Sequence, residues 1–343
     1  MVFSRRITFA AICLSSIWSS ASAQSPSGAA SQNIESPEIA FASHRDGNWE
    51  IYVTDSAGRS QRRLTRRDAQ DRFPLWSPDG AQIAFGSQVD SRWELWVMDS
   101  NGTRERHLYS QIVAKSARGW SRDGKRIAFA AVADENIDVY TVDVESTQVT
   151  RLTSSPGEDR DPSWSPDGTR LAFSSTRDGN AEIYVMRADG SDVRRLTTNS
   201  ASDESPTWSP DGSSIAFVSD RDGTQDLYVM RPDGRGLTRL TVGAGVTKDV
   251  PRWAPDTSRI AFQIARGENY DMGIVRISDR RRTDLASSSG YDGMYTWAPD
   301  GRHVAFISGR DGVDGLYTVD ADGRHLVRLT ASPSLNPAWQ LRR

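Results

Sequence analysis

The stretch WSPDGTRLAF at residues 164–173 brings together residue types that could do chemistry, because Ser165 and Asp167 follow a tryptophan closely. A nucleophilic serine also needs a general base and an oxyanion hole. Near-copies of the same stretch begin at Trp76 and Trp208, and alanine replaces the serine in two further copies. A catalytic serine would not need copies of itself. We therefore interpret the stretch as a type I turn, with proline at its second position.

Other reactive residue types point to no enzyme either. A serine hydrolase needs a G-x-S-x-G elbow, which does not occur in the sequence. The chain has four histidines: His44, His107, His303 and His325. They fall at different positions of the repeat described below, whereas metal ligands must converge. The segments MDSNG and VDADG lack the later acidic ligand of a calcium loop and are predicted to be hairpin turns. We expect no metal and no cofactor.

The chain is built from a repeat of about 44 residues. Its marker tryptophans stand at positions 76, 120, 164, 208, 253, 297 and 339. The typical unit continues with a turn such as SPDG, an apolar triplet such as IAF, a polar loop typified by RDGN, an alternating segment such as EIYVM, and a final RRLT or a relative of it. These features predict four short antiparallel strands per unit, which is the pattern of a β-propeller blade. The RDG loops are predicted to be turns, with surface Arg–Asp pairs of little energetic value.

The repeat also predicts the number of blades. Residues 37–343 divide into seven units, and the first unit lacks a tryptophan strand that only the last can supply. We expect an all-β, seven-bladed propeller of four-stranded antiparallel blades, forming one domain. Its ring would be closed by the C-terminal strand joining the N-terminal blade. The periodic tryptophans are predicted to pack between blades rather than to react.

The N-terminus reads as an export signal. Residues 1–23 combine two arginines, a short apolar run and a small-residue cleavage site at Ala23. Residues 24–36 are predicted to be a flexible leader. Cleavage would remove Cys13, the only cysteine, and would leave no integral membrane span in the mature chain. The net charge of −3 argues against a nucleic-acid partner. We expect a monomeric protein in the periplasm or beyond it.

Residues 175–212, STRDGNAEIYVMRADGSDVRRLTTNSASDESPTWSPDG, resemble the repeat of TolB-type, WD40-like β-propellers. The resemblance covers residues 37–343. It implies an exported propeller that binds a protein, as TolB of the Tol–Pal envelope system binds a lipoprotein. TolB carries an α/β domain before a six-bladed propeller. Here only the leader precedes the repeats, so that domain is not expected and seven blades are.

Propeller topology sorts the loops into two faces. The SPDG and ADG turns share one face, called here the turn face. The RDGN loops and the segments leading to each tryptophan share the other, called here the RDG face, and they vary between units, as binding loops do. Five residues before each tryptophan stand Asp71, Lys115, Asp159, Asp203, Lys248, Asp292 and Ser334. The following positions include Arg72, Arg160, Glu204 and Asp249. Around a channel mouth these residues form either a solvated polar rim or a mixed-charge socket.

Three aromatic residues on the RDG face are candidate binding anchors: Trp49, Trp93 and Tyr270. Trp49 and Trp93 belong to adjacent units and could form one patch, unless each is buried against its neighbouring loop. The function that we expect is a non-enzymatic binding module for a protein or envelope component, possibly a lipoprotein. The alternative is a carbohydrate-active lyase or hydrolase that uses the acidic residues of the channel mouth. A third hypothesis is a purely structural scaffold.

Overall fold

The computed structural model describes residues 37–113, 119–247, 249–285 and 287–341. The predicted signal peptide (1–23), the predicted leader (24–36), Lys115 and Lys248 lie outside these residues. The described chain is all-β, as predicted, and contains no helix that could span a membrane. Within it, alternating apolar residues with turn signals between them form twenty-eight strands.

The strands make five four-stranded antiparallel sheets and one of eight strands. The first sheet contains β28 (Ser334–Trp339), β1 (Ile39–Ser43), β2 (Glu50–Thr54) and β3 (Arg62–Arg63). The eight-stranded sheet contains β4 (Gln70–Trp76), β5 (Gln82–Val89), β6 (Arg92–Asp99), β7 (Arg106–Ile112), β8 (Gly119–Trp120), β9 (Arg126–Ala133), β10 (Asn136–Asp143) and β11 (Val149–Arg151). Its two halves, β4–β7 and β8–β11, are paired only at Ile112 and Ala131 among the described residues.

The remaining sheets repeat the same order. One contains β12 (Asp159–Trp164), β13 (Arg170–Ser175), β14 (Glu182–Arg187) and β15 (Arg194–Arg195). The next contains β16 (Asp203–Trp208), β17 (Ile215–Ser219), β18 (Asp226–Met230) and β19 (Thr238–Arg239). The next contains β20 (Arg252–Trp253), β21 (Arg259–Arg266), β22 (Asn269–Arg276) and β23 (Arg282–Leu285). The last contains β24 (Asp292–Trp297), β25 (His303–Ser308), β26 (Gly315–Asp320) and β27 (Val327–Arg328).

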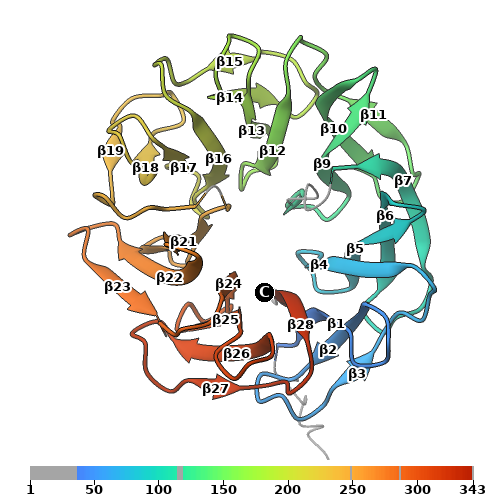
Figure 1. The fold of residues 1–343 in the computed structure, drawn as a ribbon. Coiled ribbons are helices and arrows are strands. Elements are labelled where there is room, and N and C mark those ends of the chain that lie inside the picture. Colours follow the sequence, from blue (N-terminus) through green and yellow to red (C-terminus); the bar gives the residue numbers. More distant parts are fainter. Residues whose placement is uncertain (1–36, 114–118, 248, 286, 342–343) are drawn as a thin grey trace, which may run out of the picture. The chain divides into compact units, whose positions relative to one another are not determined.

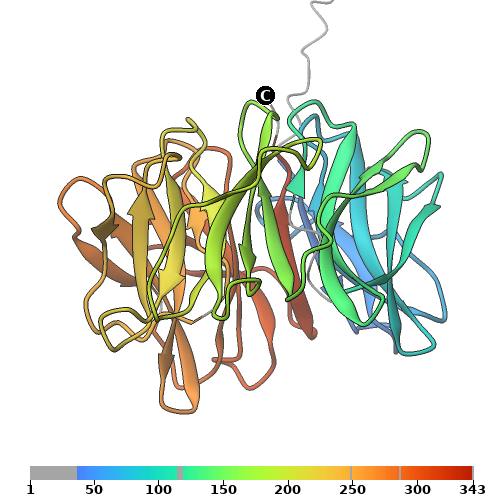
Figure 2. The same ribbon diagram turned by 90° about the horizontal axis from the view of Figure 1, so that it is seen from above.

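Successive sheets follow one another around a common centre (Figure 1). Each first strand of a unit ends at a marker tryptophan, and we call these the Trp strands: β4, β8, β12, β16, β20, β24 and β28. Those labelled in Figure 1 lie nearest the centre, and the short fourth strands lie outermost. The strands run between two loop-bearing faces, as Figure 2 shows from the side. The last strand, β28, pairs with β1, where Ile39 lies opposite Trp339 and Ser43 opposite Ser334.

The marker tryptophans pack between neighbouring units, as predicted. Six of the seven are at least nine-tenths buried, and Trp253 is partly buried. Several indole N–H groups donate across to the preceding unit, for example from Trp76 to the Ala338 carbonyl at 3.1 Å and from Trp297 to the Arg252 carbonyl at 2.9 Å. Packing of these large side chains therefore joins successive sheets. The WSPDG segments are tight turns, in which Gly168 N–H donates to the Ser165 carbonyl at 2.9 Å.

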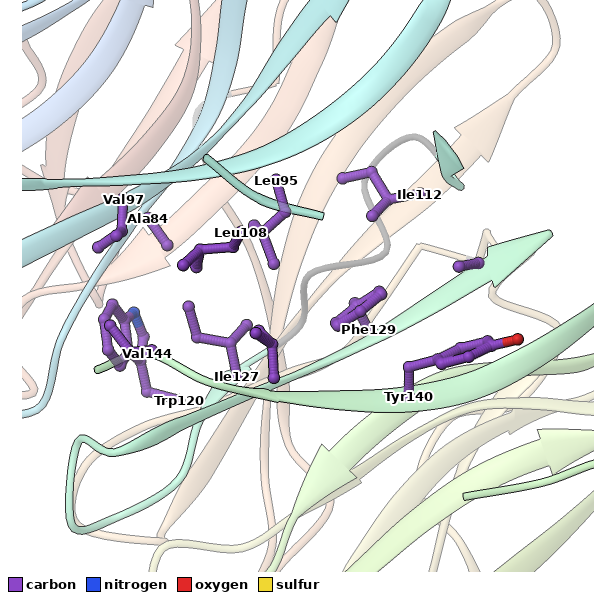
Figure 3. Packing of buried hydrophobic residues seen from close by; sticks show 12 residues of the cluster. Ala84, Leu95, Val97, Leu108, Ile112, Trp120, Ile127, Phe129, Tyr140 and Val144 are labelled. Carbon is purple, nitrogen blue, oxygen red and sulfur yellow. The ribbon is translucent and has the colours of Figure 1, made fainter. Parts of the chain in front are cut away.

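The hydrophobic core is divided among the spaces between sheets. One cluster joins the β4–β7 half of the large sheet to the β8–β11 half, with Leu95 and Leu108 facing Ile127 and Phe129 (Figure 3). Corresponding clusters lie between the other neighbouring sheets. Each apolar triplet thus contributes a fully buried phenylalanine, such as Phe129, to a rigid frame from which the loops project.

Candidate functional site

The aspartates that begin the Trp strands are buried, so the predicted rim of exposed carboxylates is wrong. Asp71, Asp159, Asp203 and Asp292 are all 0% exposed. Three of them form ion pairs with the arginine of their own unit's RDG loop, eighteen residues later. Arg177 Nη2 lies 3.0 Å from both carboxylate oxygens of Asp159. Arg221 lies 2.7 Å from Asp203, and Arg310 lies 3.0 Å from Asp292.

The same arginines are held on two further sides. Each Nε donates to a serine opposite the aspartate, at 2.8 Å from Arg177 to Ser175 and at 2.7 Å from Arg310 to Ser308. Each guanidinium also lies over a phenylalanine–tyrosine pair, for example over Tyr184 at 4.9 Å from the ring centroid. We call this arrangement of aspartate, serine and arginine the arginine clip. It shows that these RDG arginines are structural and partly buried, whereas we had predicted surface pairs of little value.

The aspartates of the RDG loops are engaged as well. Asp46 accepts a hydrogen bond from the Tyr52 hydroxyl at 2.5 Å and forms an ion pair with Arg63 at 3.0 Å. Burial, reinforced by this hydrogen bond, raises the pKa of Tyr52 to about 12. The same partners recur around Asp178, Asp222 and Asp311. These contacts hold the loops on the strands, so their geometry is fixed before any ligand arrives.

Asp71 at the start of β4 departs from the clip. Val89 stands where these three units carry the arginine, eighteen residues after the aspartate. Neither Asp71 carboxylate oxygen has a hydrogen-bond partner in the part of the chain that the structure describes, and neither has the hydroxyl of Ser87 opposite. Burial, opposed by the nearby Ser87 and Thr65 hydroxyls, raises the pKa of Asp71 to about 6. This unit therefore contains a buried acid without its counter-ion.

Another arginine lies over the aromatic pair of this unit. Arg67 reaches forward from the preceding loop and lies 3.6 Å from the ring centroid of Trp96 and 5.5 Å from that of Phe85. Its guanidinium forms an ion pair with Glu105 on the outer side of the sheet. The aromatic pair is thus covered as in the clip, but the arginine that covers it is paired with a different acid.

Four partly buried residues next to Asp71 form a compact patch on the RDG face. Arg72 lies over the Trp49 ring, 4.6 Å from its centroid, and Phe73 contacts Trp93 with centroids 5.1 Å apart. We call these four residues the β4 patch. Arg72 donates to Gln70 at 2.7 Å and has no ion pair within the described residues, where its buried Nε is also unpartnered. Burial lowers the pKa of Arg72. The two predicted tryptophan anchors therefore flank consecutive residues of one strand.

Phe73 is held in the left-handed region, with φ of 58°. Equivalent residues of the other full-length Trp strands are held similarly, and the register with the neighbouring strand shifts at the same point. These residues are Asp161, Ser205, Met294 and Asn336. A bulge with one left-handed residue is thus part of the repeat. Because this bulge recurs, its backbone strain does not identify a functional site, but the bulge changes the direction of the side chains at these positions.

The remaining predicted residues lie apart from the β4 patch. Tyr270 of β22 is 39% exposed and contacts Tyr291, which precedes β24, with ring centroids 5.9 Å apart. Arg160 forms an ion pair with Glu158 at 2.7 Å, and Glu204 accepts from Ser202 at 2.5 Å.

Asp249 accepts a hydrogen bond from the Val250 amide at 3.0 Å. The structure therefore brings together only part of the predicted set.

The histidines are less scattered than we predicted. His303 Nε2 lies 3.4 Å from Asp320, and His325 Nδ1 lies 2.7 Å from the same carboxylate. His44 instead contacts Trp49, and His107 contacts Trp96. Among the residues that the structure describes, no group of three or more His, Cys, Asp and Glu side chains is arranged to hold a metal ion.

Two features of the site were missed from sequence. The clip arginines could have been found from the constant spacing of eighteen residues between aspartate and arginine in three units, with Val89 as the exception. No other unit carries an arginine at the sequence position of Arg67, so periodicity could not reveal its covering role.

Comparison with known proteins places the chain in a family. Residues 86–250 and 244–342 match the PD40 family, described as the TolB beta propeller domain. No curated protein matches the sequence.

Solved structures share the fold but differ in function. TolB of Acinetobacter baumannii is 22% identical with a TM-score of 0.57, and the match covers 89% of this chain and 66% of that one. An oligogalacturonate lyase of Vibrio parahaemolyticus is 18% identical with a TM-score of 0.67, covering 82% and 86%. A puromycin-hydrolyzing peptidase of Mycobacterium tuberculosis is 16% identical with a TM-score of 0.66, covering 86% and 54%. Because the family match spans most of the sequence, the chain belongs to the TolB β-propeller family.

Proposed function

We propose that this protein is an exported, non-enzymatic binding module that recognises a protein of the cell envelope through the β4 patch. The observation that carries the proposal is the combination of two partly exposed tryptophans with an arginine that has no acidic partner in the described chain. Tryptophan and arginine are the residues that most often dominate binding energy at protein interfaces. Their arrangement around one bulged strand makes the patch rigid before binding.

The arginine favours a partner with an acidic or carbonyl-rich segment. Arg72 is half-buried against Trp49, so a carboxylate placed on it would be shielded from water and would form a strong hydrogen bond. The flanking indole rings would bury the apolar side chains of the same segment. A lipoprotein domain, as the family resemblance implies, is one such partner.

A lyase or hydrolase finds less support. Of the six acidic residues expected at the channel mouth, Asp159, Asp203 and Asp292 are buried in arginine clips, where an arginine already occupies the carboxylate. Asp71 has a pKa of about 6, but it is 0% exposed and so does not face a substrate.

The proposed module is a complete ring. The seven four-strand sets β28–β3, β4–β7, β8–β11, β12–β15, β16–β19, β20–β23 and β24–β27 are interpreted as seven blades. Pairing of β28 with β1 supports closure of this ring by the C-terminal strand. A signal peptide cleaved near Ala23 would deliver the ring to the periplasm.

The test is a double variant, Trp49→Ala with Trp93→Ala, used to recover partners from envelope extract and then to measure affinity for the purified partner. We expect at least a tenfold loss of affinity, which corresponds to about 1.4 kcal/mol. The matched control replaces two exposed leucines of the turn side, Leu237 and Leu326, by alanine. Unchanged affinity of a folded tryptophan variant, or equal loss in the control, would contradict the proposal.

A further inference from the structure

A groove on the turn face lies between the sheets β12–β15 and β16–β19. It has a volume of about 610 Å³. Its walls come from the end of β14, the turn that follows it, the short strand β15 and the turn after β18. Val185, Leu196 and Pro232 contribute apolar lining, and no aromatic side chain belongs to the lining.

Arginines dominate the polar lining of this groove. Five line it, with two aspartates: Arg170, Arg187, Arg194, Arg195, Arg231, Asp192 and Asp233. The formal charge of the lining is therefore +3, in a chain whose net charge is −3. Arg195 is compensated from outside the lining by Asp178 and Glu182, and Arg231 lies 3.6 Å from Asp233, so the excess charge comes from Arg170, Arg187 and Arg194 around Asp192. Asp192 is shared between Arg187 and Arg194, at 3.8 and 2.9 Å. Two arginines thus compete for one carboxylate, which leaves positive potential for a ligand.

The strand register concentrates this charge further. Arg170 of β13 lies directly opposite Arg187 of β14, and like charges opposite each other destabilise a sheet. Arg170 is exposed and has no ion pair within the described residues. At the same register position another sheet carries the opposite charges Arg126 and Asp143. A further like-charge pair, Arg259–Arg276, has each arginine in an ion pair, with Asp256 and Asp279 respectively. The groove therefore carries a local electrostatic cost that an anionic ligand would relieve.

A second groove provides an internal comparison. It lies between the β4–β7 and β8–β11 strands, again on the turn face, with a volume of about 670 Å³. Its lining contains Arg104, Arg106 and Lys125 together with Asp99, Asp143 and Glu145, so its formal charge is zero. The two grooves occupy equivalent places in the fold but differ in charge, so the shape of the groove does not by itself require arginines.

We infer that the groove between β14 and β18, called here the arginine groove, binds an acidic protein segment that carries apolar side chains between its carboxylates. Guanidinium groups match carboxylates in bidentate geometry, and the apolar lining can bury aliphatic side chains. The lack of an aromatic platform in the lining favours a peptide over an acidic sugar chain. This site is on the face opposite the β4 patch, and ligand binding in the groove does not depend on the proposed function. Together with that function it would let the protein join two partners.

The test uses the full mature chain and a fluorescein-labelled peptide of alternating glutamate and leucine, with a glutamine–leucine peptide as the uncharged reference. Binding is followed by fluorescence anisotropy at low and physiological salt. We expect the glutamate peptide to bind and the double variant Arg170→Glu with Arg187→Glu to weaken it at least tenfold. The matched control, Arg104→Glu with Lys125→Glu in the neutral groove, is expected to change the affinity less than twofold.

Three results would overturn the inference. The glutamate peptide does not bind, the control weakens binding as much as the groove variant, or oligogalacturonate binds in the groove and the peptide does not. Because Arg170 and Arg187 are exposed, thermal unfolding of each variant is expected to match the parent chain, and Arg170→Gln provides a milder substitution if it does not. The Trp49→Ala and Trp93→Ala variant is expected to leave peptide binding unchanged, which separates this inference from the proposed function.

Discussion

The sheet β12–β15 and the β4–β7 half of the large sheet come from the same repeat but treat the same buried aspartate differently. Asp159 is bound by Arg177, which also donates to Ser175. In the unit of Asp71, Val89 stands at the arginine position, and Ser87 opposite the aspartate has no partner in the described chain. In the first unit these polar side chains bind one another and stabilise the fold. In the second, the absence of that arginine leaves a buried acid with a raised pKa, and the neighbouring Arg72 has no acidic partner in the described chain. The comparison teaches that individuality in a repeat protein lies where the shared network is broken.

Removing a clip arginine should have the largest effect on stability, because it makes an ordinary unit resemble that of Asp71. Arg177→Met should leave Asp159 buried and unpaired, as Asp71 is now, and should lower the free energy of unfolding by about 3 kcal/mol or more. Urea denaturation at pH 7 measures the loss. Adding Asp159→Asn to the same chain should recover most of it, and a loss below 1 kcal/mol in the single variant would show that the clip is not stabilising.

Removing the charge of Asp71 should have the opposite effect and raise the free energy of unfolding. A folded pKa near 6, against an unfolded value of 3.8, means that Asp71 favours the fold when protonated. Its contribution is fully present below pH 4 and is lost as pH rises through 6. Asp71→Asn should therefore raise stability at pH 7.5 by up to about 3 kcal/mol, since one pKa unit corresponds to about 1.4 kcal/mol.

The measurement is urea denaturation of both chains at pH 5 and pH 7.5. We expect the difference between variant and parent to grow with pH. If the difference in stability between variant and parent is the same at pH 5 and pH 7.5, the pKa of Asp71 is not raised in the folded protein. Asp159→Asn, made in a clip, is the matched control and should destabilise.

The missing arginine can also be restored. Val89→Arg places a guanidinium eighteen residues after Asp71, and we expect about 1–2 kcal/mol of stabilisation at pH 7 from the new charged hydrogen bonds. The pKa of Asp71 should fall below 4, which a carbon-detected NMR titration of the carboxyl would follow. If Arg67 prevents the new side chain from entering, the pKa will stay near 6, and Val89→Gln will behave identically.

The smallest effect compares two marker tryptophans. Trp76 donates its indole N–H to the Ala338 carbonyl, whereas the indole nitrogen of Trp164 has no hydrogen-bond partner in the described chain. Replacing either by phenylalanine removes similar volume, so Trp76→Phe should cost about 1 kcal/mol more than Trp164→Phe. Thermal unfolding of the two variants gives the difference, and equal costs would mean that the inter-unit hydrogen bond contributes nothing.

Much of the fold could be predicted because its signals are local and periodic. The tryptophan, turn, triplet and RRLT of each unit predicted the strand order and the all-β class, and Trp76 and Trp297 pack as expected. The site was harder because its contacts cross strands. Asp159 looked like a rim residue until its pairing with Arg177 placed it inside, and the facing charges of Arg170 and Arg187 depend on a strand register that composition does not reveal.

The central claim is that the β4 patch is where a partner binds, and site-specific photo-crosslinking tests it most directly. A photoreactive phenylalanine analogue is placed at position 49, at position 93 and, as a control on the turn side, at position 326, and the protein is irradiated in its native envelope. The account predicts that positions 49 and 93 crosslink to the same envelope protein and that position 326 does not. Absence of a product from both patch positions, or the same product from position 326, would contradict it.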